Sequence, residues 1–382
     1  MPQVKPDIET FAKIKVIGVG GSGGNAIARM ITRQIKGVNF AAVNTDVQDL
    51  HHSNAPEKIH IGKELTKGLG AGMNPLVGRQ AAEESREQIR DSVKNLDMVF
   101  ITCGLGGGTG SGAGPIIAEE AKDVGALTIA IVTRPFSWEG SQRAKIAEEA
   151  LEQLQERVDT LITIPNDKIL QVIDKKTSLI DAFAIVDDIL RQGVQGISDL
   201  ITTPGLVNVD FADVKTIMEG GGPALMGVGR ATGNERAVEA AKLAVNSPLL
   251  ELSIDGAKGV LFSISGGADM TMSEVNQAAQ IITEAIDPDA KVIFGAIIDD
   301  KLRKGELKVT VIATGFKGAN MKDAHLPLNR EEAGDDSDNQ GKSINTNRDD
   351  KKSFIPLVNN EPAEIPGDDE WDIPAFVRKK KK

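Results

Sequence analysis

The chain has 382 residues and a formal net charge of −11, with 40% hydrophobic, 26% charged and 3% aromatic residues. This length is enough for two or three domains with a sizeable core. A nucleic-acid-binding function is not expected, because phosphate backbones favour basic surfaces and unpaired bases favour aromatic side chains.

Nothing in the sequence indicates export or membrane insertion. Residues 1–12 form a polar, flexible N-terminal extension without the apolar run of a signal peptide. The longest apolar runs, such as Ala126–Val132, are too short to span a bilayer. The single cysteine, Cys103, excludes an internal disulfide framework and a cysteine-based zinc site. We therefore expect a cytoplasmic protein without a transmembrane segment.

Strands and helices are predicted to alternate over residues 13–177. The spacing is typical of βαβ units around a mostly parallel sheet. The expected strands are 13–18, 39–44, 97–102, 126–133 and 160–164, and the expected helices are 25–34, 74–94, a helix ending at 123, and 140–157.

A long helix follows over residues 178–202, where apolar residues recur at helical spacing until the breaker sequence Thr203-Pro204-Gly205. A second, smaller α/β domain is expected over residues 203–316. Its predicted strands are 224–230, 259–265, 291–297 and 307–313, and its predicted helices are 234–245 and 273–285. The fold class is therefore α/β, with a Rossmann-like parallel-sheet domain joined by a long central helix to the second domain.

The composition changes after Phe316. Residues 317–367 are polar and rich in Gly and Pro, so they cannot bury enough surface to offset chain entropy and are expected to be a disordered linker. Residues 368–382 form a tail peptide with a basic end. Within it, Ile373, Phe376 and Val377 would share one face of a short helix suited to a partner's groove.

The first of two glycine-rich loops is Gly18–Asn25, which follows a predicted strand and precedes a predicted helix. Glycines let backbone N–H groups approach phosphate oxygens, and the helix N-terminus favours an anion. Gly18, Gly20 and Gly23 also satisfy G-x-G-x-x-G, with Asp46 about 20 residues on, so a nicotinamide-dependent oxidoreductase is an alternative. A tight turn without a ligand is another.

The second loop, Gly106–Gly112, contains five glycines in seven residues. Glycine is entropically costly, so this density indicates close backbone packing around phosphate oxygens. Thr109 and Ser111 add hydroxyl donors. A dehydrogenase has no need of a second phosphate loop, and neither loop is a Walker A motif.

The run Gly106–Gly112 matches the signature of the tubulin/FtsZ GTPase family, and further segments resemble its bacterial cell-division members. Those segments are 43–46, 67–72, 161–168 and 205–214. The resemblance covers roughly residues 14–316 and returns in the tail peptide. It implies a GTP-binding domain over 13–177, the central helix over 178–202, and a C-terminal activation domain over 203–316 that carries the synergy loop.

The resemblance also implies GTP or GDP as the cofactor, with Mg²⁺ held mainly by phosphates and water instead of protein ligands. The implied phosphate and sugar contacts are Gly21, Ser22, Gly23, Gly24 and Asn25, with Gly107, Gly108, Thr109 and Gly110 around the β- and γ-phosphates and Ala71, Gly72 and Met73 sensing the γ-phosphate. The implied ribose-side residues are Glu139 and Arg143, and the implied base-reading residues are Asn166, Phe183 and Asp187. Ser22 stands where the family more often has glycine, so its side chain must point away or add a hydroxyl contact.

Plainer interpretations of several of these residues stay open. Asp187 could lie on a solvated helix face, and Phe183 could belong to the core. Glu139 and Arg143, four residues apart, could simply pair with each other.

The loop from Asn208 to Asp213 has two interpretations that are compatible. Asp210 could cap a helix that contains Asp213 in its first turn. By the resemblance, Asp210 and Asp213 would polarise the attacking water, and Asn208 would help to position it. The loop would do so at the nucleotide of the adjacent subunit, so the active site would be completed on assembly.

The implied partners are other copies of the chain, assembled head-to-tail, and membrane-tethering division adaptors such as FtsA, bound through Asp368–Arg378. The implied location is the mid-cell division ring on the inner face of the membrane. A tubulin-like scaffold that binds nucleotide without turnover is a further alternative, and the presence of Asp210 and Asp213 counts against it.

Overall fold

The computed structural model describes residues 12–170, 177–203, 205–247, 250, 253–299 and 302–316. Residues 1–11 of the expected N-terminal extension, the expected linker over 317–367 and the expected tail peptide over 368–382 lie outside the described residues. The predictions made for them, including adaptor binding through Asp368–Arg378, stay predictions.

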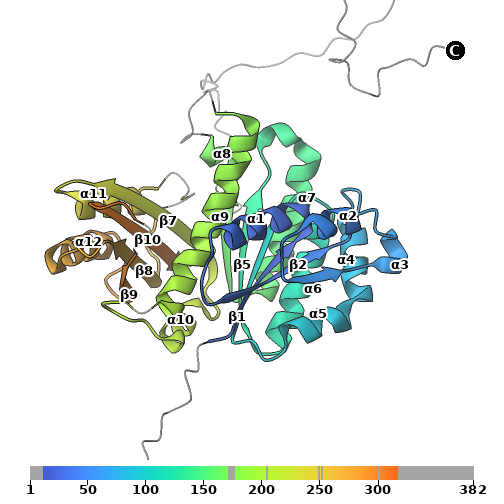
Figure 1. Ribbon diagram of the computed structural model, residues 1–382, viewed down its shortest axis with the longest axis horizontal. Coiled ribbons are helices and arrows are strands. Elements are labelled where there is room, and N and C mark those ends of the chain that lie inside the picture. Colours follow the sequence, from blue (N-terminus) through green and yellow to red (C-terminus); the bar gives the residue numbers. More distant parts are fainter. Residues whose placement is uncertain are drawn as a thin grey trace, which may run out of the picture. The chain divides into compact units, whose positions relative to one another are not determined.

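The described residues form a ten-stranded sheet in the order β3-β2-β1-β4-β5-β6-β7-β10-β8-β9 (Figure 1). Neighbouring strands from β3 to β7 pair in parallel, β10 pairs antiparallel with β7 and β8, and β9 is parallel to β8. The strands are β1 (Ile14–Val19), β2 (Val38–Asn44), β3 (Glu57–His60), β4 (Met98–Gly104), β5 (Leu127–Arg134), β6 (Thr160–Pro165), β7 (Gly222–Thr232), β8 (Gly259–Gly266), β9 (Lys291–Ile298) and β10 (Glu306–Thr314). The mainly parallel α/β fold class predicted from the sequence is confirmed.

Helices cover both faces of the parallel part of the sheet. One face packs against α1 (Gly20–Thr32), α9 (Leu179–Thr202) and α10 (Phe211–Met218), and the other against α4 (Pro75–Glu84), α5 (Arg86–Val93), α6 (Thr109–Asp123) and α7 (Ser141–Arg157). In β1, Ile14 and Val16 face the first layer, whereas Ile17 and Val19 face the second. Burial on both faces explains the nearly continuous apolar strands.

A third core cluster joins α11 (Arg236–Val245) and α12 (Met272–Glu284) to strands β7 to β10. The remaining short helices are α2 (Val47–His52), α3 (Lys63–Thr66), the 3-10 turn η1 (Ser137–Glu139) and α8 (Asn166–Ile169). None of the helices in the described ranges is long and apolar enough to cross a membrane.

Two helices differ from the sequence prediction. The helix expected at Asn25 begins at Gly20, so most of the first glycine-rich loop is the first turn of α1. The helix expected over 74–94 is broken at Ser85, where φ is −105° and ψ is 17°, and continues as α5. The central helix, in contrast, runs from Leu179 to Thr202, close to the expected range.

The two expected domains share the sheet. Thr160, Leu161 and Ile162 of β6 pair with Gly222, Pro223 and Ala224 of β7, which bridges the two halves. The domain boundaries at 177 and 203 therefore stay a prediction, although α9 lies between the two sets of helices in Figure 1.

An ion-pair cluster ties α11 to the start of α12. Buried Arg236 donates from Nε to Glu274 Oε1 at 2.6 Å and from Nη1 to Asp269 Oδ2 at 2.7 Å. Glu274 also closes a capping box with Thr271. The Arg236 hydrogen bond is the main reason that the pKa of Glu274 falls from 4.5 to about 2.

We expect this cluster to make the fold sensitive to acid. A carboxyl group whose pKa is lower in the folded state stabilises the fold above its unfolded pKa, and that contribution is lost as pH falls from about 4.5 toward 2. Urea unfolding at pH 7, 5, 4 and 3 measures the free energy of unfolding. Between pH 7 and pH 3 this free energy should fall less for Glu274→Gln than for the unaltered chain, because glutamine keeps the capping geometry but does not titrate. Equal losses for both proteins would contradict the assignment.

Candidate functional site

A cleft of about 320 Å³ opens where β1, β4, β5 and β6 end at their carboxyl edge. This is the edge at which open parallel sheets bind ligands. The predicted site residues that line it are Gly21, Ser22, Gly107, Gly108, Thr109, Gly110, Glu139, Arg143, Asn166, Phe183 and Asp187. The structure thus brings together eleven residues from five separate segments of the sequence.

Two helices begin at this cleft, α1 at Gly20 and α6 at Thr109. In the described part of the chain, no side chain caps either helix, and neither has an acidic residue in its first turn. Their first N–H groups and their positive dipole ends therefore face the cleft and favour an anion there.

The second glycine-rich loop is closely packed at Gly108 and Gly110. A Cβ atom at Gly108 would lie 2.8 Å from Ala71 Cβ and 2.9 Å from Asn74 N, and one at Gly110 would lie 2.9 Å from Gly104 O. Gly106 has a φ of +93°, which L side chains rarely adopt. The glycines therefore allow both the path of the loop and its close approach to neighbouring backbone.

Ser111 does not serve the cleft as the sequence suggested. Its buried hydroxyl accepts a hydrogen bond from Gly106 N at 2.9 Å and so stabilises the conformation of the loop. Thr109 does line the cleft, and its hydroxyl lies 2.7 Å from that of Thr45.

The residues of the first glycine-rich loop have different surroundings. Gly21 and Ser22 line the cleft, and the Ser22 side chain lies beside Gly104. Gly23 is buried, and a Cβ atom there would overlap Thr102 O of β4, so this glycine allows α1 to pack on the sheet. Gly24 and Asn25 line a small adjacent hollow of about 90 Å³.

The three predicted base-reading residues, Asn166, Phe183 and Asp187, all line the cleft. Asn166 is buried, and its Oδ1 has no hydrogen-bond partner among the described residues. The ring of Phe183 contacts Phe136 edge-on at 5.7 Å between centroids. An unpaired buried acceptor beside an aromatic ring suits a planar ligand that donates hydrogen bonds.

Asp187 also lines the cleft, and it is hydrogen-bonded to a residue of another helix. Its Oδ2 accepts a hydrogen bond from Arg29 Nε of α1 at 2.8 Å. Burial raises the pKa of the Asp187 carboxyl, and the Arg29 guanidinium partly offsets that increase. Asp187 is therefore not on a solvated helix face, which was the alternative interpretation.

Glu139 and Arg143 line the cleft and also pair with each other. Arg143 Nη1 donates to Glu139 Oε2 at 2.8 Å, and Glu139 Oε1 accepts from Phe136 N at 2.9 Å. The plainer interpretation, an i,i+4 pair, is confirmed, and the ribose-side role stays a prediction.

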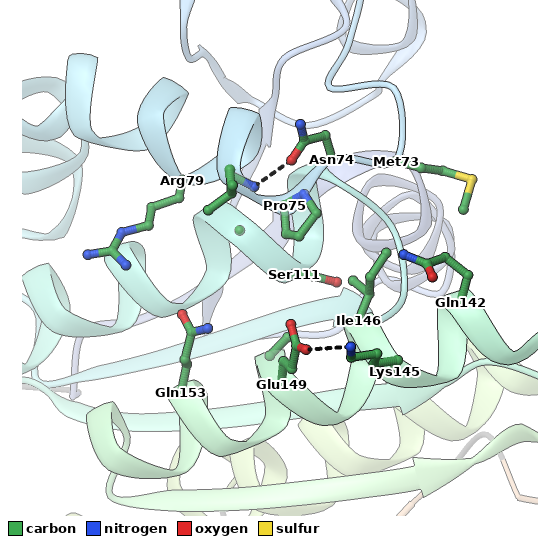
Figure 2. Close-up of a pocket in the computed structure, with 13 residues that line it drawn as sticks. Met73, Asn74, Pro75, Arg79, Ser111, Gln142, Lys145, Ile146, Glu149 and Gln153 are labelled. Carbon is green, nitrogen blue, oxygen red and sulfur yellow. Dashed lines mark hydrogen bonds and ion pairs between the residues drawn. The ribbon is translucent and has the colours of Figure 1, made fainter.

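The expected γ-phosphate sensors lie beside the second loop. Ala71 packs on Gly108, Gly72 is unobstructed, and Met73 has a φ of +62°, which is unusual for a residue with a side chain. Met73 also borders a larger hollow of about 550 Å³ between α4 and α7. Figure 2 shows Ile146, Glu149 and Gln153 of α7 on one side of this hollow and Pro75 and Arg79 of α4 on the other, with Ser111 between them. This hollow adjoins the second glycine-rich loop, but few of the predicted site residues line it.

Asn208, Asp210 and Asp213 lie elsewhere in the fold. Asp210 caps α10 by accepting from Asp213 N at 2.8 Å, as the capping interpretation predicted, and Asn208 Oδ1 accepts from Gly205 N at 2.7 Å. None of the three lines the cleft. Asp187 and Thr202, the last residue of α9, are separated by roughly 22 Å of helix. Figure 1 shows α10 near the lower end of α9 and α8 near the upper end.

The cleft fits a nucleoside polyphosphate. Two uncapped helix N-termini and a glycine-rich loop suit the phosphates, and the end with Asn166, Phe183 and Asp187 suits a base. Among the described residues, no group of three or more His, Cys, Asp or Glu side chains could hold a metal ion.

Sequence reasoning did not assign Thr45 to the site, although its segment, 43–46, carried part of the family resemblance. Thr45 is buried, and its hydroxyl lies against that of Thr109, which lines the cleft. The pairing of β1 with β2 and β4, which brings the end of β2 close to α6, cannot be read from local sequence.

Family models match most of the chain. Residues 13–174 match the tubulin/FtsZ family GTPase domain, and residues 222–317 match the FtsZ family C-terminal domain. The two matches include both glycine-rich loops and all of β7 to β10.

Solved structures give the same result. An empty FtsZ dimer from M. jannaschii is 47% identical, with a TM-score of 0.78 over 81% of this chain and 90% of that chain. An FtsZ mutant from the same organism is also 47% identical, with a TM-score of 0.78 over 81% and 92%. CetZ2 from Haloferax volcanii, solved as a GTPγS-bound protofilament, shares only the fold, at 21% identity and a TM-score of 0.70 over 82% and 96%. The chain therefore belongs to the FtsZ family of tubulin-like GTPases.

Proposed function

We propose that this chain assembles head-to-tail into filaments and hydrolyses GTP where two subunits meet. The guanine base lies against Asn166, Phe183 and Asp187, and the β- and γ-phosphates lie in the loop from Gly107 to Gly110. Asn208, Asp210 and Asp213 act on the nucleotide of the next subunit. Mg²⁺ is held by the phosphates and water and neutralises charge on them.

The observation that carries this proposal is the separation of the two carboxylates from the cleft of their own subunit. Asp210 and Asp213 are exposed beyond the end of α9, whereas the base-reading residues Phe183 and Asp187 are on its first half. Roughly 22 Å of helix is more than a side chain can cross, which supports a role for the two carboxylates at the nucleotide of another subunit.

Exposed apolar side chains near both ends support the same assembly. Leu69 is 84% exposed and Ile180 is 78% exposed beside the cleft segments, and Leu206 is 63% exposed beside Asn208. Such residues favour burial against a partner. A contact between two different faces of identical subunits produces filaments when its rotation does not close into a ring.

In the cell, the proposed filaments belong to the division ring on the inner face of the membrane, tethered by adaptors such as FtsA through Asp368–Arg378. The M. jannaschii relative agrees with self-association, since it was solved as an FtsZ dimer.

The test is a light-scattering assay with GTP, GDP, ATP and NADH, with phosphate release followed in parallel. We expect scattering and phosphate release with GTP only, and a release rate per subunit that rises with protein concentration, because each active site needs two subunits. A chain that lacks Asp368–Lys382 should assemble equally but lose adaptor binding. A concentration-independent rate would contradict the shared site, and assembly without turnover would favour a scaffold.

A further inference from the structure

Thr45 connects the second glycine-rich loop to the segment that leads to Ala71. Its hydroxyl lies 2.7 Å from that of Thr109, the first residue of α6. Its carbonyl oxygen accepts from Thr66 Oγ1 at 3.2 Å and from Gly70 N at 3.3 Å, at the start of the segment that leads to Ala71. Thr45 is therefore hydrogen-bonded both to Thr109, which lines the cleft, and to the segment before Ala71.

The position of Thr45 is itself fixed. Thr45 is fully buried, and its N–H donates to Asn44 Oδ1 at 2.8 Å. Asn44 is held in turn, because its Nδ2 donates to Asp49 Oδ2 at 2.6 Å. The residue thus has little freedom to turn its hydroxyl elsewhere.

The direction of the hydroxyl bond follows from counting protons. Each hydroxyl has one proton to donate, and Thr109 is the one hydrogen-bond partner of the Thr45 hydroxyl among the described residues. A buried hydroxyl proton without an acceptor is costly. Thr45 therefore donates to Thr109, and the Thr109 proton is left for an acceptor in the cleft.

We infer that Thr45 is a positioning residue that orients the Thr109 hydroxyl toward a phosphate oxygen of the bound nucleotide. Thr45 itself does not touch the nucleotide. By donating to Thr109 Oγ1, the Thr45 hydroxyl orients the Thr109 hydroxyl as a donor before the nucleotide binds. The Thr109 side chain then does not need to reorient on binding. The chain of two hydroxyls also strengthens the second hydrogen bond by polarisation. This inference rests on the proposed binding of GTP in the cleft.

The test uses the full chain at concentrations at which light scattering detects no assembly, so that assembly does not affect the measured affinity. The dissociation constants of GTP and GDP are measured by calorimetric titration for Thr45→Val, Thr45→Ser and Thr109→Val. Valine has nearly the shape of threonine but no hydroxyl, and serine keeps the hydroxyl. We expect Thr45→Val to weaken GTP binding about tenfold and Thr45→Ser to stay within about threefold of the unaltered chain.

The decisive comparison is the double variant. If Thr45 acts through Thr109, then Thr45→Val changes GTP affinity less than about twofold in a Thr109→Val background. A purely structural role would weaken binding equally in both backgrounds and would overturn the inference. Melting temperatures of the nucleotide-free proteins identify misfolding, and Thr45→Ala replaces Thr45→Val if the latter does not fold.

The two proposals can fail separately. If the unaltered chain binds guanine nucleotides and Thr45→Val binds them equally well, this inference alone is wrong. If the unaltered chain binds none, the proposed function and this inference are both overturned.

Discussion

Replacing Asp213 with alanine is expected to leave the affinity for GTP unchanged and to slow GTP hydrolysis by about 100-fold or more. The carboxylate is proposed to polarise the attacking water at the neighbouring subunit's nucleotide. The capping bond to Asp210 uses only the backbone N–H of Asp213, so the substitution keeps α10 capped. Phosphate release at saturating GTP and protein measures the effect, and normal turnover would contradict the assignment.

Asp210→Ser is the matched control for the helix cap. Serine is a good N-cap residue, so this variant keeps α10 capped but removes the carboxylate. We expect slow hydrolysis with normal unfolding behaviour. Slow hydrolysis only in variants that also unfold early would instead assign the loop a structural role.

Mixing two defective variants tests the shared site directly. Asp213→Ala keeps an intact cleft, and Asp187→Ala keeps an intact Asp213 but is expected to bind guanine poorly. A mixture should hydrolyse GTP faster than the sum of the two proteins measured separately, because one subunit supplies the nucleotide and the other supplies the carboxylate. No recovery in the mixture would contradict completion by the adjacent subunit.

Gly112→Ala is expected to destabilise the fold by about 3 kcal/mol or more. A Cβ atom at this position would overlap Pro75 O and would lie 2.6 Å from Arg79 N, both backbone atoms of α4. Backbone cannot turn aside as a flexible side chain can, so α4 and α6 must move apart. Urea unfolding of the nucleotide-free chain measures the loss.

The matched control is Gly107→Ala in the same loop. A Cβ atom at Gly107 meets nothing within 4 Å, so this substitution should change the free energy of unfolding by less than about 1 kcal/mol. Equal destabilisation by both variants would mean that the flexibility of glycine, and not the close packing of α4 on α6, accounts for the loss.

Local features of the fold could be predicted from the sequence because neighbouring residues determine them. Apolar periodicity located α9 within one residue at each end. The cap at Asp210 was predicted from a carboxylate placed just before a helical stretch. The glycine-rich loops located residues that line the cleft, and we expect phosphates there because backbone can approach phosphate oxygens closely only where side chains are absent.

The sequence by itself therefore determined the α/β class, the central helix and the two glycine-rich loops that line the cleft. Only the tertiary structure decided which residues share the site, because those contacts join distant parts of the chain. Arg29 and Asp187 pair across 158 positions, and Thr45 meets Thr109 across 64. Gly23 allows α1 to pack on the sheet, and Ser111 accepts a hydrogen bond within its loop. The length of α9 separates Asp210 and Asp213 from the cleft of their own subunit. Local patterns carry no information on such distances, which depend on the path of the chain through the sheet.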